Sequence, residues 1–408
     1  MIAELVIKNI GTLATPCGNA AKAGEAQGEI SILNDAWISV KDGVIIGTGT
    51  GTAPEGNRVF NAGGRLATPG LVDPHTHMVF GGWREHELAM KLRGMPYLDI
   101  LAAGGGILST VQSTRIATEE ELIQKTLPIL NRMLALGVTT CEAKSGYGLS
   151  LEDEIKQLRV VRALEERHHA ELVRTFMGAH ALPAEYKENR RAYIDLVINE
   201  MIPAVSDLAE FCDVFCETGA FTVEESQKIL MAGKLAGLKL KCHSDEINPL
   251  GGTEMAAELG AVSCEHLIVC TPSGIEAMKR NGTIACCLPA TSFYLDAEYA
   301  PVRAMITAGI PVAFGSDFNP GSCPTNSLSL AMNIGCYKYR MTPEECLTAV
   351  TLNAAAAICR AEIVGTLDIG KQADILIWNA PSFEYIFYRF GDNLVDTVFK
   401  KGNEVMSV

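Results

Sequence analysis

Two histidines separated by one residue, His75 and His77, follow an apolar run that ends at Val72. In a strand, residues i and i+2 share a face, so both imidazoles would project the same way from its end. Pro74 has no backbone donor and is typical of a place where sheet pairing ends. Two imidazoles on one side of a rigid element can form half of a metal site. A bare pair also fits a strand end with two half-buried histidines, so partners elsewhere must decide.

Further ligand-type side chains follow other apolar runs of the chain. His243 ends the run 238–243, and Asp317 comes two residues after the run 310–315. If these runs are strands of a closed barrel, their carboxyl ends meet at one mouth, where active sites lie. Together with His75 and His77, they supply three nitrogens and one oxygen, a donor set suited to Zn²⁺ or Fe²⁺. The sequence therefore predicts a metal site formed by these four residues.

Two more residues could carry the proton chemistry of a hydrolysis. A metal at this place would lower the pKa of a bound water from 15.7 to about 7, which makes a nucleophile near neutral pH. Glu246, three residues after His243, is the predicted general acid and base. His266 is predicted to donate to a carbonyl oxygen and to stabilise the developing oxyanion. The alternatives are a surface carboxylate and a buried, non-catalytic histidine.

Alternating strand and helix patterns from residue 65 to 360 must position these side chains. Eight β-type runs cover 66–72, 137–143, 171–178, 213–217, 238–243, 261–266, 283–287 and 310–315. Helical patterns such as 118–136 and 151–168 lie between them, and capping boxes begin at Thr118 and Thr222. This alternation predicts a (β/α)₈ TIM-type barrel as the catalytic domain.

The two ends of the chain, 1–64 and 361–408, have short strand patterns instead. Lys41-Asp42-Gly43 and Lys401-Gly402 are typical hairpin turns. Neither end could bury a core alone, so we expect both to form one composite β-sandwich domain beside the barrel. The fold class is therefore α/β.

Composition narrows the classes of partner. The formal net charge of −14 argues against binding nucleic acid or an anionic membrane surface, although a local cation could still bind an anionic small substrate. No run approaches the roughly 20 apolar residues of a membrane helix, and the first residues do not resemble a signal peptide. The thirteen cysteines are scattered and form no Cys-x-x-Cys pair, which predicts a reduced, cytoplasmic protein.

Several motifs resemble the amidohydrolase superfamily and, within it, the imidazolonepropionase family. The similarity spans nearly the whole chain. It rests on Pro69-Gly70-Leu71-Val72-Asp73-Pro74-His75-Thr76-His77, Phe80-Gly81-Gly82-Trp83-Arg84, Ala102-Ala103-Gly104-Gly105-Gly106-Ile107, Lys144-Ser145-Gly146-Tyr147-Gly148-Leu149, Phe176-Met177-Gly178-Ala179-His180, His243-Ser244-Asp245-Glu246 and Gly315-Ser316-Asp317-Phe318-Asn319-Pro320-Gly321.

The resemblance implies a cyclic amidohydrolase of histidine degradation, which hydrolyses 4-imidazolone-5-propanoate to N-formimidoyl-L-glutamate. It also implies one divalent or trivalent ion of Zn or Fe per subunit, a homodimer, and a catalytic role for Asp317 beside Glu246 and His266. The substrate, a small molecule with a carboxylate, would contact Arg84, Tyr147, His180, Glu246, Asn319, Gly321 and Ser322. Arg84 offers a bidentate fork for that carboxylate, and Tyr147 and His180 are expected to add donors.

Some features of the sequence leave choices open. Many binuclear relatives carry a carboxylated lysine at the end of the fourth strand, but here that strand ends at Glu217, which favours one metal. Lys144 and Glu217 have no assigned role, and Gly104-Gly105-Gly106 is interpreted as a flexible flap near the site. The alternatives are a purine or pyrimidine deaminase of the same superfamily, for which Arg84 and Tyr147 have no evident use, and a non-catalytic scaffold built on the barrel.

Overall fold

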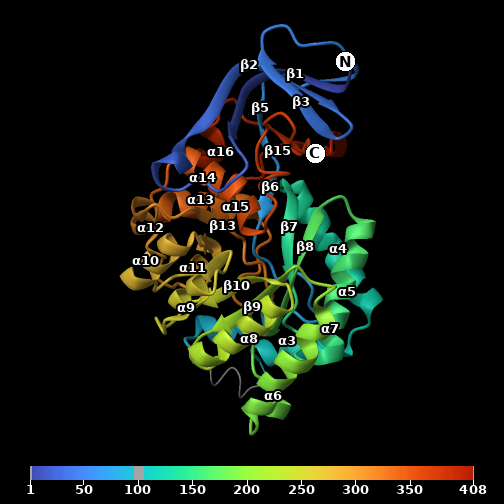
Figure 1. The fold of residues 1–408 in the computed structure, drawn as a ribbon. Helices are drawn as coiled ribbons and strands as arrows, with labels where there is room; N and C mark the ends of the chain where they lie inside the picture. Colours follow the sequence, from blue (N-terminus) through green and yellow to red (C-terminus); the bar gives the residue numbers. More distant parts are fainter. Residues whose placement is uncertain (1, 96–104, 408) are drawn as a thin grey trace.

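Two sheets of eight strands each form the framework of the molecule in the computed structural model, which describes residues 2–95 and 105–407. In Figure 1 the N-terminal segment (blue) and the C-terminal segment (red) lie together at one end, and the second sheet with its helices fills the rest. Gly104, part of the expected flap, lies outside the described residues.

The first sheet combines strands from both ends of the chain. Its order is β16-β15-β14-β5-β1-β2-β3, with β4 paired to β1. The sheet folds onto itself, so that Phe60 packs edge-on against Phe399 with ring centroids 5.1 Å apart. Both predicted hairpins are present, and positive φ angles at Asp42 (51°) and Gly43 (74°) fit the first turn. Its strands are β1 (Ala3–Pro16), β2 (Ile30–Lys41), β3 (Val44–Thr50), β4 (Gly56–Asn61), β5 (Leu66–Pro69), β14 (Ile375–Trp378), β15 (Val395–Lys400) and β16 (Asn403–Ser407).

The second sheet is the predicted barrel of parallel strands. Its order follows the sequence from β6 to β13. The seam between the first and last strands is closed just beyond their ends, where the Asp317 amide donates to the His75 carbonyl (3.0 Å) and the His77 amide donates to the Phe318 carbonyl (2.9 Å). Its strands are β6 (Leu71–Asp73), β7 (Val138–Lys144), β8 (Glu171–Ala179), β9 (Phe211–Cys216), β10 (Lys239–Ser244), β11 (Ser263–His266), β12 (Ile284–Cys287) and β13 (Val312–Phe314).

The single strand predicted over 66–72 is wrong, because these residues form two strands in different sheets. β5 pairs with β1 and β14, whereas β6 pairs with β7 of the barrel. Gly70 lies at the crossing, where a Cβ atom would come within 2.3 Å of the Thr139 hydroxyl oxygen. The whole run is buried, and Pro69-Gly70 is the local sign of a break within it. We propose that Gly70, instead of residue 64 or 65, marks the boundary between the two domains.

Helices alternate with the barrel strands and cover their outer face, as α4 and α5 do beside β7 and β8 (Figure 1). The capping boxes at Thr118 and Thr222 are both formed, each with the glutamate three residues later. The helices of the described residues are α1 (Leu88–Leu92), α3 (Ile107–Ile116), α4 (Glu119–Ala135), α5 (Leu151–Arg167), α6 (Arg190–Leu196), α7 (Ile202–Val205), α8 (Val223–Leu235), α9 (Gly252–Glu258), α10 (Pro272–Asn281), α11 (Pro289–Tyr294), α12 (Val302–Ala308), α13 (Leu328–Lys338), α14 (Pro343–Ala349), α15 (Leu352–Ala357) and α16 (Tyr385–Tyr388). Short helical turns lie at η1 (Gly24–Gly28), η2 (Glu85–Glu87), η3 (Ala184–Tyr186) and η4 (Val197–Met201).

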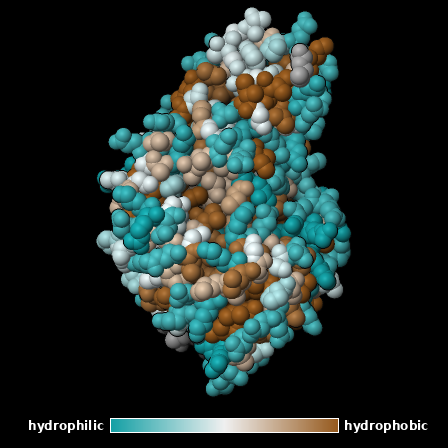
Figure 2. Space-filling view, in the orientation of Figure 1, coloured by the Kyte–Doolittle hydropathy of each residue, from teal (hydrophilic) through white to brown (hydrophobic). Residues whose placement is uncertain are grey.

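On the face shown in Figure 2, hydrophilic residues cover most of the surface, and hydrophobic residues gather in separate patches. Within residues 2–95 and 105–407, no helix combines the length and the apolar character that crossing a membrane requires. All thirteen cysteines are free thiols, and most of them are buried.

Candidate active site

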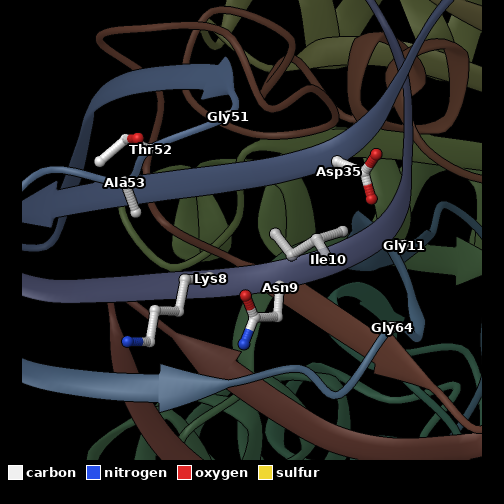
Figure 3. A pocket seen from close by; sticks show the side chains of 9 residues that line it. All are labelled: Lys8, Asn9, Ile10, Gly11, Asp35, Gly51, Thr52, Ala53 and Gly64. Carbon is white, nitrogen blue, oxygen red and sulfur yellow. The ribbon is translucent and has the colours of Figure 1, made fainter.

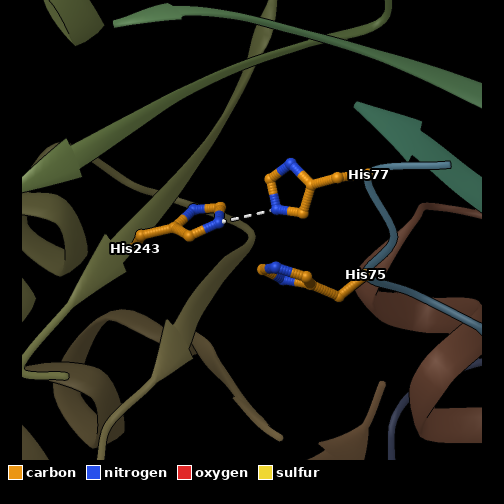
Figure 4. A group of neighbouring side chains, drawn as sticks. All are labelled: His75, His77 and His243. Carbon is orange, nitrogen blue, oxygen red and sulfur yellow. Dashed lines mark hydrogen bonds between the residues drawn. The ribbon is translucent and has the colours of Figure 1, made fainter. Parts of the chain in front are cut away.

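The four predicted metal ligands meet at the carboxyl ends of the barrel strands. His75 and His77 follow β6, His243 lies in β10 and Asp317 follows β13, and all four are at most 3% exposed. The three imidazoles face one another (Figure 4), and the Nε2 atoms of His77 and His243 are 3.3 Å apart. Asp317 Oδ1 lies 3.4 Å from His75 Nε2 and 3.8 Å from His77 Nε2.

These donor atoms suit a metal ion. Ligands about 2.0–2.1 Å from a tetrahedral zinc lie about 3.4 Å from each other, close to the separations found here. His75 Nε2 is buried and has no hydrogen-bond partner among the described residues. Burial lowers the pKa of His75 and of His77 well below the ordinary value, which favours the neutral form that binds metals. The residues therefore fit a divalent ion.

Two carboxylates orient two of these imidazoles. His75 Nδ1 donates to Glu265 Oε2 at 2.7 Å, and His243 Nδ1 donates to Asp213 Oδ1 at 3.1 Å. Burial alone would raise the pKa of both carboxyls. However, His243 and Lys144 hold the pKa of Asp213 well below its usual range, and Lys241 and Lys144 lower the pKa of Glu265 to about 2. Both groups are therefore ionised, and each ring directs Nε2 towards the cluster.

A cavity of about 630 Å³ opens above the cluster. Eleven of the twelve predicted site residues line this cavity, and only His75 lies beneath it, fully buried. The eleven are His77, Arg84, Tyr147, His180, His243, Glu246, His266, Asp317, Asn319, Gly321 and Ser322. The barrel thus brings together residues from nearly the whole length of its sequence.

Glu246 and His266 lie side by side in this cavity. The distance from Glu246 Oε1 to His266 Nδ1 is 3.7 Å. Burial raises the pKa of Glu246 to about 7, although the charge of His243 opposes the shift. Burial lowers the pKa of His266 to about 4, so this ring is neutral at pH 7 and has one N–H to donate. Glu246 can therefore exchange a proton near neutral pH.

Glu217, at the end of the fourth barrel strand, holds the loop that carries Glu246. Its Oε2 accepts the backbone N–H groups of Ile247 (2.9 Å) and Asn248 (3.1 Å). Its Oε1 accepts the amide of Asn248 (3.1 Å) and the backbone N–H of Thr218 (2.7 Å). Glu217 is 2% exposed, so these four bonds satisfy a buried carboxylate and fix the loop.

Arg84 lies in the cavity wall directly against Gly321. A Cβ atom built on Gly321 would fall 0.9 Å from Arg84 Nη2, so a glycine is required for the guanidinium to lie here. Arg84 Nε is buried without a hydrogen-bond partner among the described residues, and Glu87 Oε1 is 3.8 Å away. Lys91 binds the Gly321 carbonyl (2.9 Å) and Glu87 (3.1 Å). A partly unpaired guanidinium in a cavity can bind an anion.

Asn319, which lines the cavity, also makes hydrogen bonds within its own loop. Its Oδ1 accepts the backbone N–H groups of Gly321 (2.8 Å) and Ser322 (2.7 Å), and its Nδ2 donates to the Asp317 carbonyl (2.7 Å). The Ser322 hydroxyl also donates to Oδ1 (3.1 Å). The Asn319 amide therefore organises its own loop and connects Asp317 with the segment beside Arg84.

His180 and Tyr147 differ in the hydrogen-bonding groups that they leave free for a ligand. His180 Nδ1 lies 3.1 Å from the Gly146 carbonyl, which can only accept, so Nδ1 carries the proton. Burial lowers the pKa of His180 to about 3, so Nε2 is an acceptor at neutral pH. Burial raises the pKa of Tyr147, which keeps its hydroxyl protonated.

Backbone strain marks the strand ends that carry these groups. Asp245, His266 and Asp317 have φ angles of 52°, 70° and 51°, in the left-handed region that non-glycine residues seldom adopt. The left-handed conformation is sterically least favourable at His266, because aspartate tolerates this region better. Strain of this kind clusters at functional sites, where the surrounding structure maintains it.

Sequence reasoning missed the charged residues beneath the cluster. Glu142, Lys144, Asp213, Lys241 and Glu265 are all fully buried in the barrel interior. Lys241 shares a strand face with His243, and Glu142 shares one with Lys144, so the period of two could have revealed this layer. A second grouping of His75, Glu265 and Cys286 uses the His75 nitrogen that already binds Glu265, so it is not an independent metal site.

A second cavity, of about 320 Å³, lies in the first sheet between Asn9 of β1 and Asp35 of β2 (Figure 3). It lies far along the molecule from the histidine cluster, and none of its nine lining residues is a histidine or cysteine.

Comparison with known proteins agrees with this geometry. Residues 66–405 match the model of the amidohydrolase family. The imidazolonepropionase of Alkaliphilus metalliredigens is 51% identical, over 100% of this chain and 99% of that protein. The imidazolonepropionase of Fusobacterium nucleatum is 50% identical, over 99% of each. The structure of a 5-methylcytosine deaminase from Klebsiella pneumoniae has the same fold (TM-score 0.74, 18% identity, 97% of each chain covered). The chain therefore belongs to the amidohydrolase family and, within it, groups with the imidazolonepropionases.

Proposed function

We propose that this chain is a metal-dependent cyclic amidohydrolase that converts 4-imidazolone-5-propanoate to N-formimidoyl-L-glutamate in histidine degradation. Relatives about 50% identical over their whole length carry the name imidazolonepropionase. One observation carries the proposal: a cluster of metal ligands and the guanidinium of Arg84 line the same cavity. The first can serve hydrolysis of an amide, and the second can hold the carboxylate of the substrate's side chain.

His75, His77, His243 and Asp317 are proposed to hold one ion per subunit, either zinc or iron. When bound, such an ion acidifies water and polarises a carbonyl group. Thr291 donates to Asp317 Oδ2 at 2.6 Å, and Oδ1 faces the imidazoles of His75 and His77. Three imidazole nitrogens and one carboxylate would leave a divalent ion and its direct ligands with net positive charge, as stabilising a developing oxyanion requires.

Glu246 is proposed to move the proton. Its carboxylate takes a proton from the attacking water and passes it to the ring nitrogen when the C–N bond of the cyclic amide breaks. His266, neutral and beside Glu246, donates its N–H to the carbonyl oxygen as negative charge develops there. Because the pKa of Glu246 is about 7, the same group can act first as base and then as acid.

The remaining lining residues are proposed to position the substrate. Arg84 binds the propanoate carboxylate, and Gly321 leaves the space that its guanidinium occupies. Tyr147 donates its hydroxyl, whereas His180 Nε2 accepts an N–H of the imidazolone ring. Ser322 presents its backbone beside Arg84. Asn319 supports this contact by holding the loop of residues 317–323.

We also infer a cytoplasmic homodimer whose partner is a small carboxylate-bearing substrate, and neither nucleic acid nor a membrane. Thirteen free thiols suit a reducing compartment, and the net charge of −14 disfavours polyanionic partners. Exposed aromatic residues such as Tyr337 and Phe390, whose rings are 5.8 Å apart, would suit a contact between copies.

The decisive test is the loss of 4-imidazolone-5-propanoate absorbance with purified protein, with zinc and iron measured in the same sample. Turnover by the metal-loaded protein is expected, together with loss of turnover in Glu246→Gln at unchanged metal content. Ammonia release from a purine or pyrimidine panel, without turnover of the imidazolone, would favour the deaminase alternative. A metal-free protein without any hydrolase activity would support the scaffold alternative.

A further inference from the structure

A continuous chain of buried charges connects two of the metal ligands beneath the cavity. It runs from Asp213 through Lys144, Glu142 and Lys241 to Glu265, with all five side chains fully buried. Barrel interiors are usually filled by branched apolar side chains, and burying each ion costs several kcal/mol of solvation. Such an arrangement at the level directly below the metal ligands calls for a function.

Each lysine contacts a carboxylate that also holds a ligand imidazole. Lys144 Nζ lies 2.7 Å from Asp213 Oδ2, and Asp213 Oδ1 accepts from His243 Nδ1. Lys241 Nζ lies 3.1 Å from Glu265 Oε1, and Glu265 Oε2 accepts from His75 Nδ1. The sequence lysine, carboxylate, imidazole thus occurs twice, with its members on different strands.

Glu142 joins the two halves, at 2.8 Å from Lys144 and 3.6 Å from Lys241. The three carboxylates and two ammonium groups carry a net charge of −1. With the Asp317 carboxylate, this balances the two positive charges of a divalent ion.

The chemistry of imidazole explains what this arrangement achieves. A carboxylate at Nδ1 fixes the tautomer and the ring plane, so that Nε2 faces the metal position. An ammonium group on the other carboxylate oxygen keeps that carboxylate from rotating away and compensates its buried charge. By contrast, His77 Nδ1 has no hydrogen-bond partner among the described residues. Two of the three imidazoles, those of His75 and His243, are therefore fixed by a carboxylate at Nδ1.

We propose that Lys144 and Lys241 are positioning residues of the metal site, which act through Asp213 and Glu265 to hold His243 and His75 ready for the ion. This inference rests on the proposed binding of a metal at these ligands. It assigns to Lys144 a role in metal affinity and not in proton transfer, since Lys144 does not line the cavity.

The test measures Zn²⁺ affinity by competition with a chromogenic chelator, using the full-length protein. Lys144→Met and Asp213→Asn should each weaken Zn²⁺ binding about 10- to 100-fold. The double variant should bind no more weakly than Asp213→Asn alone, because the lysine acts through that carboxylate. Lys400→Met is the matched control: Lys400 is also buried and paired, 2.7 Å from Asp374, but it lies in the first sheet. Its loss should leave Zn²⁺ affinity unchanged.

Each outcome has a distinct meaning. If the unmodified protein binds no Zn²⁺ or Fe²⁺, the proposed function itself fails. If the unmodified protein binds Zn²⁺ and folded Lys144→Met binds it equally well, the positioning role is overturned and the proposed function stands. Should Lys144→Met not fold, the nearly isosteric Asp213→Asn and Glu265→Gln decide, and unchanged affinity in both would refute the inference. An equal loss in Lys400→Met would show a general effect of losing a buried ion pair, which also overturns it.

Discussion

Adding one methyl group at Gly321 should displace Arg84 and weaken substrate binding selectively. In Gly321→Ala the new Cβ would lie 0.9 Å from Arg84 Nη2 and 1.8 Å from its Cζ, so the guanidinium must leave its place. The backbone at Gly321 does not have a positive φ, so alanine itself introduces no backbone strain. The free end of an arginine can swing away at little cost, and we therefore expect the protein to fold and to bind its metal as before.

The size of the effect follows from the lost contact. A hydrogen bond to a charged group contributes about 1.5–3 kcal/mol. At 1.4 kcal/mol for each factor of ten, KM for 4-imidazolone-5-propanoate should rise about 10- to 150-fold. Because Arg84 holds a carboxylate that does not react, kcat should change much less. The assay is steady-state loss of substrate absorbance, with KM and kcat determined separately.

Two comparisons make this prediction sharp. A substrate analogue without the carboxylate should be hydrolysed equally well by Gly321→Ala and by the unmodified enzyme. Gly28→Ala is the control, because its Cβ would meet only the Glu345 Cγ atom, at 3.5 Å, and its KM should not change. Arg84→Ala combined with Gly321→Ala should be no worse than Arg84→Ala alone. A normal KM in Gly321→Ala, or an equal loss with the analogue, would refute the assignment of Arg84.

Three further predictions concern the proton, its loop and the metal. Glu246 must be ionised to accept a proton, so kcat/KM should fall as the pH drops through the pKa of Glu246, about 7. A bound cation that stabilises the carboxylate would lower this pKa. A flat profile of kcat/KM from pH 5 to 8 would contradict the prediction. Glu217→Gln should lower kcat, since an amide replaces one oxygen that accepts N–H groups of the Glu246 loop. It should also move the acid limb of the kcat/KM profile to lower pH, because the charge of Glu217 raises the pKa of Glu246. A variant with reduced kcat but an unmoved limb would leave only a structural role. Chelation of the metal should abolish turnover and lower the unfolding temperature, because an ion at 100 times its Kd adds about 2.7 kcal/mol to the free energy of unfolding. Calorimetry that detects no change in the unfolding temperature on metal removal would argue against a bound ion.

Much of the barrel was predictable because its strands are short, apolar and regularly separated by capped helices. The proposed ligands could be predicted because each lies at or within three residues of the end of an apolar run or, for His77, two residues beyond His75, at the place where barrel strands end. Their convergence required only the closed parallel topology, which does not depend on side-chain detail. Pro69-Gly70 could suggest a break within 66–72, but the division between two sheets could not be predicted, since pairing partners are chosen by tertiary contacts and both halves are fully buried.

Hydrogen-bond roles were the least predictable part of the site. His180 Nε2 is an acceptor because its Nδ1 donates to the Gly146 carbonyl. The side-chain oxygen of Asn319 accepts four hydrogen bonds from donors of its own loop. The buried charges were missed for a different reason. Lysine and glutamate are so commonly exposed that the strand faces which Lys144 and Lys241 share with Glu142 and His243 were not read as buried, and the lysines' partners Asp213 and Glu265 lie on other strands.

The segments that close the barrel seam also carry most of the proposed metal ligands, so metal binding should affect the stability of the seam. The first and last strands are joined beyond their ends by bonds between the His75 carbonyl and the Asp317 amide, and between the His77 amide and the Phe318 carbonyl. Three of the four proposed ligands thus belong to the segments that close the barrel, and an ion held by them would link the same segments through side chains. Without the ion, the seam depends on these backbone bonds and on the hydrogen bond between His77 Nε2 and His243 Nε2 (3.3 Å). Removing the metal takes away the link that the ion would provide, so it should loosen the seam before it disturbs the helices. Hydrogen exchange of the His77 and Asp317 amides should therefore accelerate on chelation, while the amides of the outer helix α5 remain protected.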